Sequence, residues 1–338
     1  MAYASAGARL HLGFCNLSLS HERLYGALGV TLAAPRVTVE ATPAETVSVT
    51  VAADAVADGP GVTADAVRAD VREYASAAAD LLDVPGATLT LRESLPRHAG
   101  LGSGTQLAAT TVAAVAEAHG RDLAFRRHAP ALGRGGRSGI GVAAFEAGGF
   151  VLDAGHPTAR FTTDRPADGE WTVPPVAARH PVPDDWRFLI VRPDVEPGRS
   201  GDVEDVAMRS AVERADPEVA DRIAGIVTRR VLPAVATGRA EAFGAAVEEV
   251  GRLNGAWYAD EQGGVYRPPV GDVVASLTAS SAVFGAGQSS WGPAVYGVTD
   301  ADHAETATAA GERALAAAGI DGQVSVVCAA NEGARIGE

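Results

Sequence analysis

Polar and apolar residues alternate over several short stretches of the chain, and this alternation is typical of half-buried β-strands. It is clearest at 87–94 and at 37–53, where a turn at Thr42–Glu45 interrupts the pattern. Other strands are predicted from short apolar runs that end at turn residues. They lie at 8–14, at 139–155 (two strands joined at Ala147–Gly148), at 186–193, at 281–298 (two strands around a glycine turn) and at 323–329.

Helices are predicted where apolar residues recur every three to four positions. This spacing is found at 62–84, at 105–119 with Gly120 as a stop signal, and at 300–319. Two or three more helices are expected within 200–256. Because strands and helices do not alternate strictly, the order favours an α+β fold over a doubly wound parallel sheet.

A change in composition indicates where the chain divides. Residues 157–185 hold six prolines among many polar residues, which predicts a linker between two domains. The N-terminal domain would span 1–165 and the C-terminal domain 186–338.

The composition also excludes several classes of protein. The 338 residues carry a net charge of −14, which argues against binding to nucleic acid or a membrane surface. No apolar run is long enough to span a membrane and no secretory signal is visible, so a cytoplasmic protein is expected. All 28 basic residues are Arg, and this acidic, lysine-free composition suggests a salt-loving host. Because a Walker A loop needs Lys, any phosphate must be bound by Arg, backbone N–H groups or a metal.

The stretch RHAGLGSGTQLAAT (97–110) is the strongest candidate for a binding site. It follows a predicted strand and precedes a predicted helix, whose first N–H groups attract anions. Gly100, Gly102 and Gly104 would let a phosphate approach the backbone, although a tight turn with positive φ would also explain them. A dinucleotide-binding loop fits less well, because Thr105 stands where that fingerprint has Gly or Ala.

Three segments resemble the GHMP kinase superfamily, in the expected order. PRHAGLGSGTQLA (96–108) is similar to its phosphate loop, P-x-x-x-G-L-G-S-S. GRGGRSGIGVAAFEAGGFVLDAGH (133–156) and FGAGQSSWGPAVYG (284–297) lie where those kinases carry a G-x-x-S-G-x-D segment and a C-terminal glycine loop. The resemblance implies a two-domain GHMP-kinase-like fold, with an N-terminal domain like the second domain of ribosomal protein S5 and a ferredoxin-like C-terminal domain. The phosphate loop would be 96–106 and the glycine loop 284–293.

Two departures from the kinase pattern resemble one branch of the superfamily. The kinases use the Asp of S-G-x-D as the usual catalytic acid/base, whereas this chain reads SGIG at 138–141. The last loop carries QSSW at 288–291 instead of a plain glycine run. Together with ARLHLGF (8–14) and YGALG (25–29), these segments look like the family of β-ribofuranosylaminobenzene 5′-phosphate synthases of methanopterin biosynthesis.

The resemblance implies a transferase and not a kinase. Phosphoribosyl pyrophosphate would react with 4-aminobenzoate or 4-hydroxybenzoate to give a C-riboside 5′-phosphate, with release of CO2 and pyrophosphate. Mg²⁺ is the expected metal, because it usually binds through few carboxylates and the substrate phosphates, and no organic cofactor is expected. These small molecules are the expected partners, without nucleic acid or membrane, and a homodimer is a reasonable expectation.

Candidate site residues follow from the resemblance and from the demands of the chemistry. The catalytic candidates combine a side chain that titrates near neutral pH with a phosphate-binding guanidinium and an amide, and they are His11, Arg137 and Gln288. The phosphate-binding candidates are Gly100, Leu101, Gly102, Ser103, Gly104, Thr105, Gln106, Arg134 and Ser138. The substrate-binding candidates are Arg9, Glu22, Arg23, Gly287, Ser289, Ser290 and Trp291, with Tyr296 as a second aromatic. The metal-ligand candidates are Ser103 and Glu146, with Asp153 as a further carboxylate.

Two other functions fit the same sequence. An ATP-dependent GHMP small-molecule kinase would keep the anion-binding loop, because phosphoryl transfer depends mainly on positioning and electrostatics, but it would lack the acid/base at Gly141. A non-catalytic phospho-metabolite-binding protein would reuse the fold without turnover. The co-substrate that is consumed separates the transferase from the kinase, and stabilisation by ligand without product would indicate the binding protein.

Overall fold

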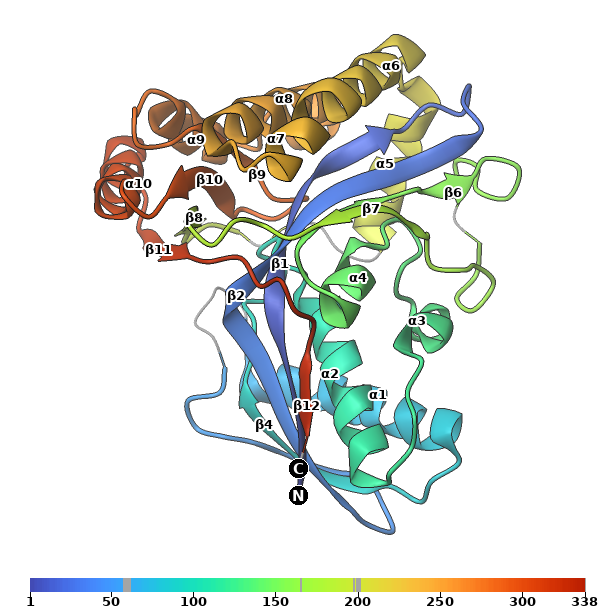
Figure 1. Cartoon of the computed structure of the whole chain (residues 1–338). Helices are drawn as coiled ribbons and strands as arrows, with labels where there is room; N and C mark the ends of the chain where they lie inside the picture. The colour runs from blue at the N-terminus through green and yellow to red at the C-terminus, as the bar shows by residue number, and fades with distance from the viewer. Residues whose placement is uncertain (57–61, 165, 197, 199–201, 338) are drawn as a thin grey trace.

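The computed structural model describes residues 1–338 except 57–61, 165, 197, 199–201 and 338 (Figure 1). The first of its two sheets has eight strands. Its main path has the strand order β12-β1-β2-β4-β3. Three further strands lie off this path: β5 and β6 each pair with β2, and β7 pairs with β5. Its strands are β1 (Ala2–Asn16), β2 (Arg23–Pro43), β3 (Ser48–Val51), β4 (Ala87–Glu93), β5 (Phe150–Asp153), β6 (His156–Pro157), β7 (Val176–His180) and β12 (Arg335–Gly337).

The second sheet has four antiparallel strands in the order β11-β8-β10-β9. They are β8 (Trp186–Pro193), β9 (Gly285–Gln288), β10 (Val295–Asp300) and β11 (Gly322–Val327). Apart from the parallel β3–β4 pair, the ladders of both sheets are antiparallel. This arrangement confirms the α+β class.

Helices cover both sheets. The first part of the chain contributes α1 (Ala64–Leu82), α2 (Ser103–Ala118), α3 (Phe125–His128), the 3-10 helix η1 (Ala129–Leu132) and α4 (Ile140–Glu146). The second part contributes α5 (Asp202–Arg214), α6 (Pro217–Ile226), the π-helix η2 (Val227–Val231), α7 (Leu232–Ala236), α8 (Ala240–Gln262), α9 (Val270–Thr278) and α10 (Ala304–Ala318). Within the described residues, no helix combines the length and apolar character that crossing a bilayer requires.

Helix α2 is the central element of the first layer. It packs on β1 and β2, α1 covers its other side, and α4 contacts it as well (Figure 1). Every residue of α2 from Gln106 to Ala116 is buried. Small Ala, Thr and Val side chains allow this close packing on several sides, and they hold the N-terminus of α2 in a fixed place.

Helix α8 joins the two sheets. It packs on β9 and β10 and also contacts β1. Its Asn254 accepts a hydrogen bond from the backbone N–H of Phe14 at 2.7 Å and donates to the Phe14 carbonyl at 2.9 Å. The β1–β2 ladder shifts register between Gly7 and Arg9 and again between His11 and Gly13, and such bulges re-aim the side chains beside them.

The structure confirms most of the predicted elements and corrects one. The predicted pair of strands at 139–155 is wrong, because residues 140–146 form α4 and only the second half is a strand. The segment predicted as a linker, 157–185, contains β7 and the buried Trp171. The short β12 at the end of the chain was not predicted, and it pairs with β1 (Figure 1). The division into 1–165 and 186–338 stays a prediction.

Candidate functional site

The loop between β4 and α2 forms the first part of the site. His98 (φ 52°), Gly100 (φ 90°) and Gly102 (φ 79°) adopt left-handed backbone conformations. Gly102 is the N-cap of α2 and makes no side-chain capping hydrogen bond, so the first N–H groups of the helix remain available. Residues 102–105 line a cavity, and the positive end of the helix dipole favours an anion there.

Strand β1 and the β9–β10 loop hold this loop in place. Arg9 donates from Nη1 to the carbonyl of Gly100 at 2.8 Å, and the Ser289 hydroxyl donates to the same carbonyl at 2.7 Å. Ser289 also accepts a hydrogen bond from the backbone N–H of His11 at 3.1 Å, and its side chain is fully buried. Ser289 was predicted to bind substrate. In the structure its hydroxyl instead links the glycine loop to β1 through these two hydrogen bonds.

Two adjoining cavities of about 460 and 300 Å³ lie in front of the loop, and we call them together the anion groove. The residues that line both cavities are Arg9, Thr105, Arg134, Glu204, Ser290 and Trp291. Burial lowers the pKa of Arg9 to about 10, and Glu204 partly opposes this effect. Arg9 is therefore still charged at neutral pH. The groove presents guanidinium groups beside the start of a helix, which suits a phosphate ligand.

Arg134 lies over the start of α2. Its Nη2 donates to the hydroxyl of Tyr74 on α1, and its guanidinium carbon lies 5.5 Å from the centre of that ring. A methyl group added at Gly104 would come within 3.0 Å of Arg134 Nη1, so the guanidinium is adjacent to the first turn of the helix. This placement agrees with the predicted phosphate-binding position of Arg134.

Arg137 enters the groove from the same segment, but its side chain is already paired. Nη1 contacts Glu204 at 2.7 Å, and Nη2 contacts Asp205, both on α5. The side chain is 15% exposed. In this arrangement, the predicted catalytic Arg137 neutralises two carboxylates at the edge of the groove.

His11 lies at the bottom of the groove on β1. It is 4% exposed, and its Nε2 has no hydrogen-bond partner within the described part of the chain. Burial, with Arg9 as the next contribution, lowers the pKa of His11 to about 3. The imidazole is therefore neutral at physiological pH, and it can accept a proton but does not carry one to donate as imidazolium.

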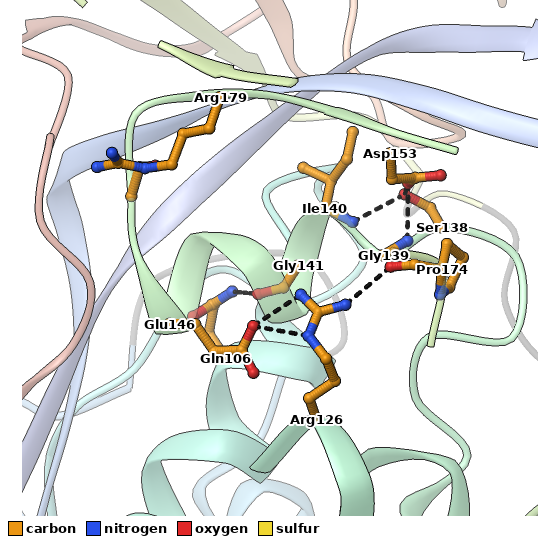
Figure 2. A network of polar contacts seen from close by, with 11 residues as sticks. Gln106, Arg126, Ser138, Gly139, Ile140, Gly141, Glu146, Asp153, Pro174 and Arg179 are labelled. Carbon is orange, nitrogen blue, oxygen red and sulfur yellow. Dashed lines mark hydrogen bonds and ion pairs between the residues drawn. The ribbon is translucent and has the colours of Figure 1, made fainter. Parts of the chain in front are cut away.

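Two predicted site residues belong to a structural network behind the loop (Figure 2). Gln106 is fully buried, and its amide donates to the carbonyl of Gly141 at 2.8 Å, so it joins α2 to α4 and does not face the groove. Glu146 pairs with Arg126 at 2.7 Å (Figure 2). The predicted metal ligands Ser103 and Glu146 are thus not brought together, because only Ser103 lines the groove.

Asp153 explains why α4 begins where it does (Figure 2). Its carboxylate accepts hydrogen bonds from the backbone N–H groups of Gly139 (2.8 Å) and Gly155 (2.9 Å) and from the Ser138 hydroxyl (3.2 Å). Burial raises its pKa to about 6 although these hydrogen bonds oppose the rise. Asp153 therefore acts as a structural acceptor, and its role as a metal ligand stays a prediction. Ser138, which also lines the groove, is partly engaged by it.

We expect Asp153→Asn to remove a pH-dependent contribution to stability. The folded pKa, about 6, lies above the unfolded value near 4, so the contribution is complete below about pH 4 and is lost as pH rises through about 6. The difference corresponds to about 3 kcal/mol. Urea unfolding of both proteins at several pH values should show the wild type losing this free energy relative to the variant between pH 4 and 7. The opposite trend would mean that the hydrogen bonds outweigh burial.

The other predicted residues of the last loop have structural partners. The Gln288 amide accepts from the backbone N–H of Arg267 (3.0 Å) and donates to the Ser290 carbonyl (3.2 Å), so it helps to fix the loop. It also lines a pocket between β1 and α8, and its catalytic role stays a prediction. A side chain at Gly287 would overlap Tyr296, which is fully buried and therefore does not stack on a substrate. Leu101 is likewise a core side chain, and its carbonyl accepts from the N–H of Arg9.

Glu22 and Arg23 lie away from the groove. Arg23 donates from its guanidinium to the carbonyls of Ala154 and Gly155, and neither residue is among those that line the groove in the described structure. Ser290 and Trp291 do line it, and their contact with substrate stays a prediction. In the described part of the chain, no group of three or more His, Cys, Asp or Glu side chains could hold a metal.

The structure adds residues that sequence reasoning missed. Glu204 on α5, Tyr74 on α1 and Tyr258 on α8 all line the groove or a pocket beside it. Each lies on a helix whose sequence shows only an ordinary amphipathic pattern. Their position depends on how α1, α5 and α8 pack around β1, so no local signal indicated them.

Comparison with known proteins identifies the fold and then the family. The model of the GHMP kinases N terminal domain matches residues 66–149. A Streptococcus pneumoniae phosphomevalonate kinase structure has a TM-score of 0.66 at 14% identity and covers 96% of this chain and 100% of that chain. The chain therefore has the GHMP kinase fold.

Sequence relatives define the branch of this superfamily. Beta-ribofuranosylphenol 5′-phosphate synthase of Methanothermobacter thermautotrophicus is 34% identical over 90% of this chain and 91% of that protein. The protein of the same name from Archaeoglobus fulgidus is 29% identical over 87% of each chain. The chain belongs to this synthase family, whose members are enzymes.

Proposed function

We propose that the protein condenses phosphoribosyl pyrophosphate with 4-hydroxybenzoate to give a C-riboside 5′-phosphate, CO2 and pyrophosphate. Family membership supports this reaction, because the relatives are named for a ribofuranosylphenol 5′-phosphate product. A phenol would result from the 4-hydroxy acid, whereas 4-aminobenzoate would give an aniline. The 4-hydroxy acid is therefore the substrate that we favour.

The observation that carries the proposal is the packing of Gly141. In the superfamily's kinases this position is the usual catalytic Asp, but here it faces Thr105 of α2. A methyl group added at Gly141 would lie 3.0–3.3 Å from the Thr105 side chain, and the Gly141 carbonyl is occupied by Gln106. A carboxylate at the kinase position would require the Thr105 side chain to shift. The site retains the means to bind a phosphate but lacks the group that serves the kinases in proton transfer.

The proposed reaction needs no net proton transfer. The bond between ribose C1 and the pyrophosphate oxygen breaks, and the ring carbon that carries the carboxylate forms a bond to C1. The bond from that ring carbon to the carboxylate then breaks, CO2 leaves, and its electron pair restores the aromatic ring. Stabilising the departing pyrophosphate is the main electrostatic requirement, and it is met best by donors that are already in place.

The anion groove supplies such donors. The N–H groups at the start of α2, Arg9 and Arg134 converge on one region, and they are held by the contacts described above. Magnesium would add positive charge on the pyrophosphate, and Ser103 and Glu204, which line the same cavity, are the residues that would contribute ligands. The main-chain and guanidinium donors bind and orient the leaving group.

We expect Arg137→Ala to raise the KM for phosphoribosyl pyrophosphate about tenfold. The variant would leave Glu204 and Asp205 unpaired beside a polyanionic substrate, and like charges weaken binding. Steady-state kinetics of pyrophosphate release measures the effect. If Arg137 acts by neutralising these carboxylates, adding Asp205→Asn should restore much of the affinity. If it binds phosphate directly, the second substitution should not help.

The test of the proposed function is pyrophosphate release by the purified protein with Mg²⁺ in high salt. Phosphoribosyl pyrophosphate is supplied with 4-hydroxybenzoate, with 4-aminobenzoate or with neither acid. We expect release that depends on the aryl acid and is matched by an equal amount of CO2. Consumption of ATP with a small-molecule acceptor, without pyrophosphate release, would instead establish a kinase. Ligand-induced thermal stabilisation without any product would indicate a binding protein.

A further inference from the structure

A pocket beside the anion groove has no role in the reaction as described so far. It lies between β1 and α8, and we call it the apolar pocket. Its walls come from Phe14 on β1, Tyr258 and Asn254 on α8, and Trp291 of the last loop, with His11 between the pocket and the groove. His11, Phe14 and Trp291 line the groove as well, so the two spaces meet at these side chains.

Two residues that line this pocket each carry a buried polar atom that has no hydrogen-bond partner among the described residues. These atoms are Nε2 of His11 and the hydroxyl of Tyr258, and the two residues are 4% and 8% exposed. An unsatisfied buried polar group costs about 1–3 kcal/mol, and native structures rarely keep such groups without a reason. Two of them around one pocket indicate a ligand group that forms hydrogen bonds with both.

The rest of the pocket combines aromatic rings with Gly, Leu and Val and with the neutral polar side chains of Asn254, Gln262, Gln288 and Ser290. Tyr258 and Trp291 pack with ring centres 4.5 Å apart, and His11 meets the edge of Phe14 at 4.6 Å. Among the described residues that line the pocket there is no Arg, Asp or Glu. A carboxylate inside it would be desolvated without a counter-charge, which is strongly unfavourable. The pocket therefore suits a neutral aromatic ring that carries one hydrogen-bonding substituent.

We propose that the apolar pocket binds the phenol end of the aryl acid and that Tyr258, together with His11, selects a hydroxyl over an amino substituent. This inference rests on the proposed function. The ring would lie with its hydroxyl inside, and the carbon that bears the carboxylate would lie at the mouth beside Trp291, facing ribose C1 in the groove.

The hydrogen-bonding roles explain the selection. A neutral imidazole carries its proton on one nitrogen only, so with that proton on Nδ1 the Nε2 atom of His11, which has no partner among the described residues, is an acceptor. Burial raises the pKa of Tyr258 well above its usual value, so its hydroxyl keeps its proton and can donate. A phenol hydroxyl donates one hydrogen bond and accepts another, which matches this pair. An aromatic amine donates two and accepts poorly.

The same arrangement assists the chemistry. When the ring carbon attacks C1, electron density moves from the hydroxyl oxygen into the ring and its proton becomes strongly acidic. His11 Nε2 accepts that proton, and it returns the proton to the oxygen when the C–CO2 bond breaks and the ring becomes aromatic again.

Tyr258→Phe is the test, because it removes only the hydroxyl. We expect kcat/KM for 4-hydroxybenzoate to fall about 10- to 100-fold and kcat/KM for 4-aminobenzoate to fall less than threefold. The KM for phosphoribosyl pyrophosphate should not change. Tyr296→Phe is the matched control, since Tyr296 is also buried and bonds to the Val247 carbonyl but does not line the pocket. It should leave the ratio of the two acids unchanged, and melting curves verify that both variants fold.

Equal losses with both acids, or no loss with either, would overturn the inference. A direct titration separates its failure from failure of the proposed function. Tryptophan fluorescence of the wild type is followed with 4-hydroxybenzoate and with benzoate, with no other substrate added. If the protein releases no pyrophosphate but binds 4-hydroxybenzoate at least tenfold more tightly than benzoate, and Tyr258→Phe abolishes this preference, the pocket assignment holds without the reaction. If there is no such preference, the pocket assignment fails.

Discussion

Gly100→Ala is expected to lower kcat/KM for phosphoribosyl pyrophosphate by at least about 100-fold, because small displacements of binding groups have effects of that size. Gly100 has φ 90°, and a Cβ there would overlap the backbone carbonyl oxygen of Ser289. A backbone atom cannot move aside as a flexible side chain can. The loop would have to shift away from the β9–β10 segment, and the N–H groups at the start of α2 would lose their register with the substrate.

Gly120→Ala is the matched control for this change. Gly120 has φ 59°, and a Cβ there would meet no atom within 4 Å. Both variants bear the cost of a left-handed conformation, about 1–2 kcal/mol, but only Gly100→Ala adds the overlap. Thermal unfolding and pyrophosphate release should therefore separate a small common loss of stability from a loss of activity confined to Gly100→Ala. Equal activity of the two variants would contradict the role of the loop.

Arg9→Met is expected to reduce kcat/KM by about 100- to 1000-fold, the range observed when one preorganised donor to a developing negative charge is removed. Arg9 is half-buried, donates to the Gly100 carbonyl at 2.8 Å and lines both cavities of the anion groove. Replacing a buried charge by an apolar side chain of similar volume is often neutral for stability or stabilising. For Arg9→Met we therefore expect a large loss of kcat/KM together with little change, or an increase, in the free energy of unfolding.

Arg36→Met provides the comparison. Arg36 lies on β2, is partly buried, and donates to the hydroxyl and the carbonyl of Ser5 at 2.8 Å, but it does not line the groove. Pyrophosphate release and urea unfolding of both variants distinguish the two roles. Arg36→Met should change stability with little effect on kcat/KM. If Arg9→Met loses activity only in proportion to a loss of folded protein, Arg9 has no direct role in the reaction.

Local signals in the sequence were sufficient for most of the secondary structure. The helical spacing at 62–84 and 105–119 corresponds to α1 and α2, and the alternation at 87–94 corresponds to β4. These elements are long or regular enough for their period to be read directly. The segment 139–155 was too short and too apolar for such a reading. Its first half is helical because the Asp153 carboxylate accepts the N–H of Gly139 at the start of α4.

The candidate site likewise has one part that the sequence predicted and one part that it did not. The glycine loop was predictable, because glycines between a strand and a helix are a local pattern with a direct physical meaning. The orientation of side chains was not predictable. Gln106 and Thr105 are neighbours in the sequence, yet Gln106 turns to Gly141 while Thr105 lines the groove.

The sequence by itself determined the class of fold, the position of the glycine loop and, through the long segments that resemble one family, the branch of the superfamily. Only the tertiary structure decided which side chains face the loop. The contacts that fix it join residues far apart in the chain, such as Ser289 with Gly100 and His11. Glu204 and Tyr258 reach the site through the packing of α5 and α8. Such contacts depend on how whole elements pack together, and no local period of the sequence encodes them.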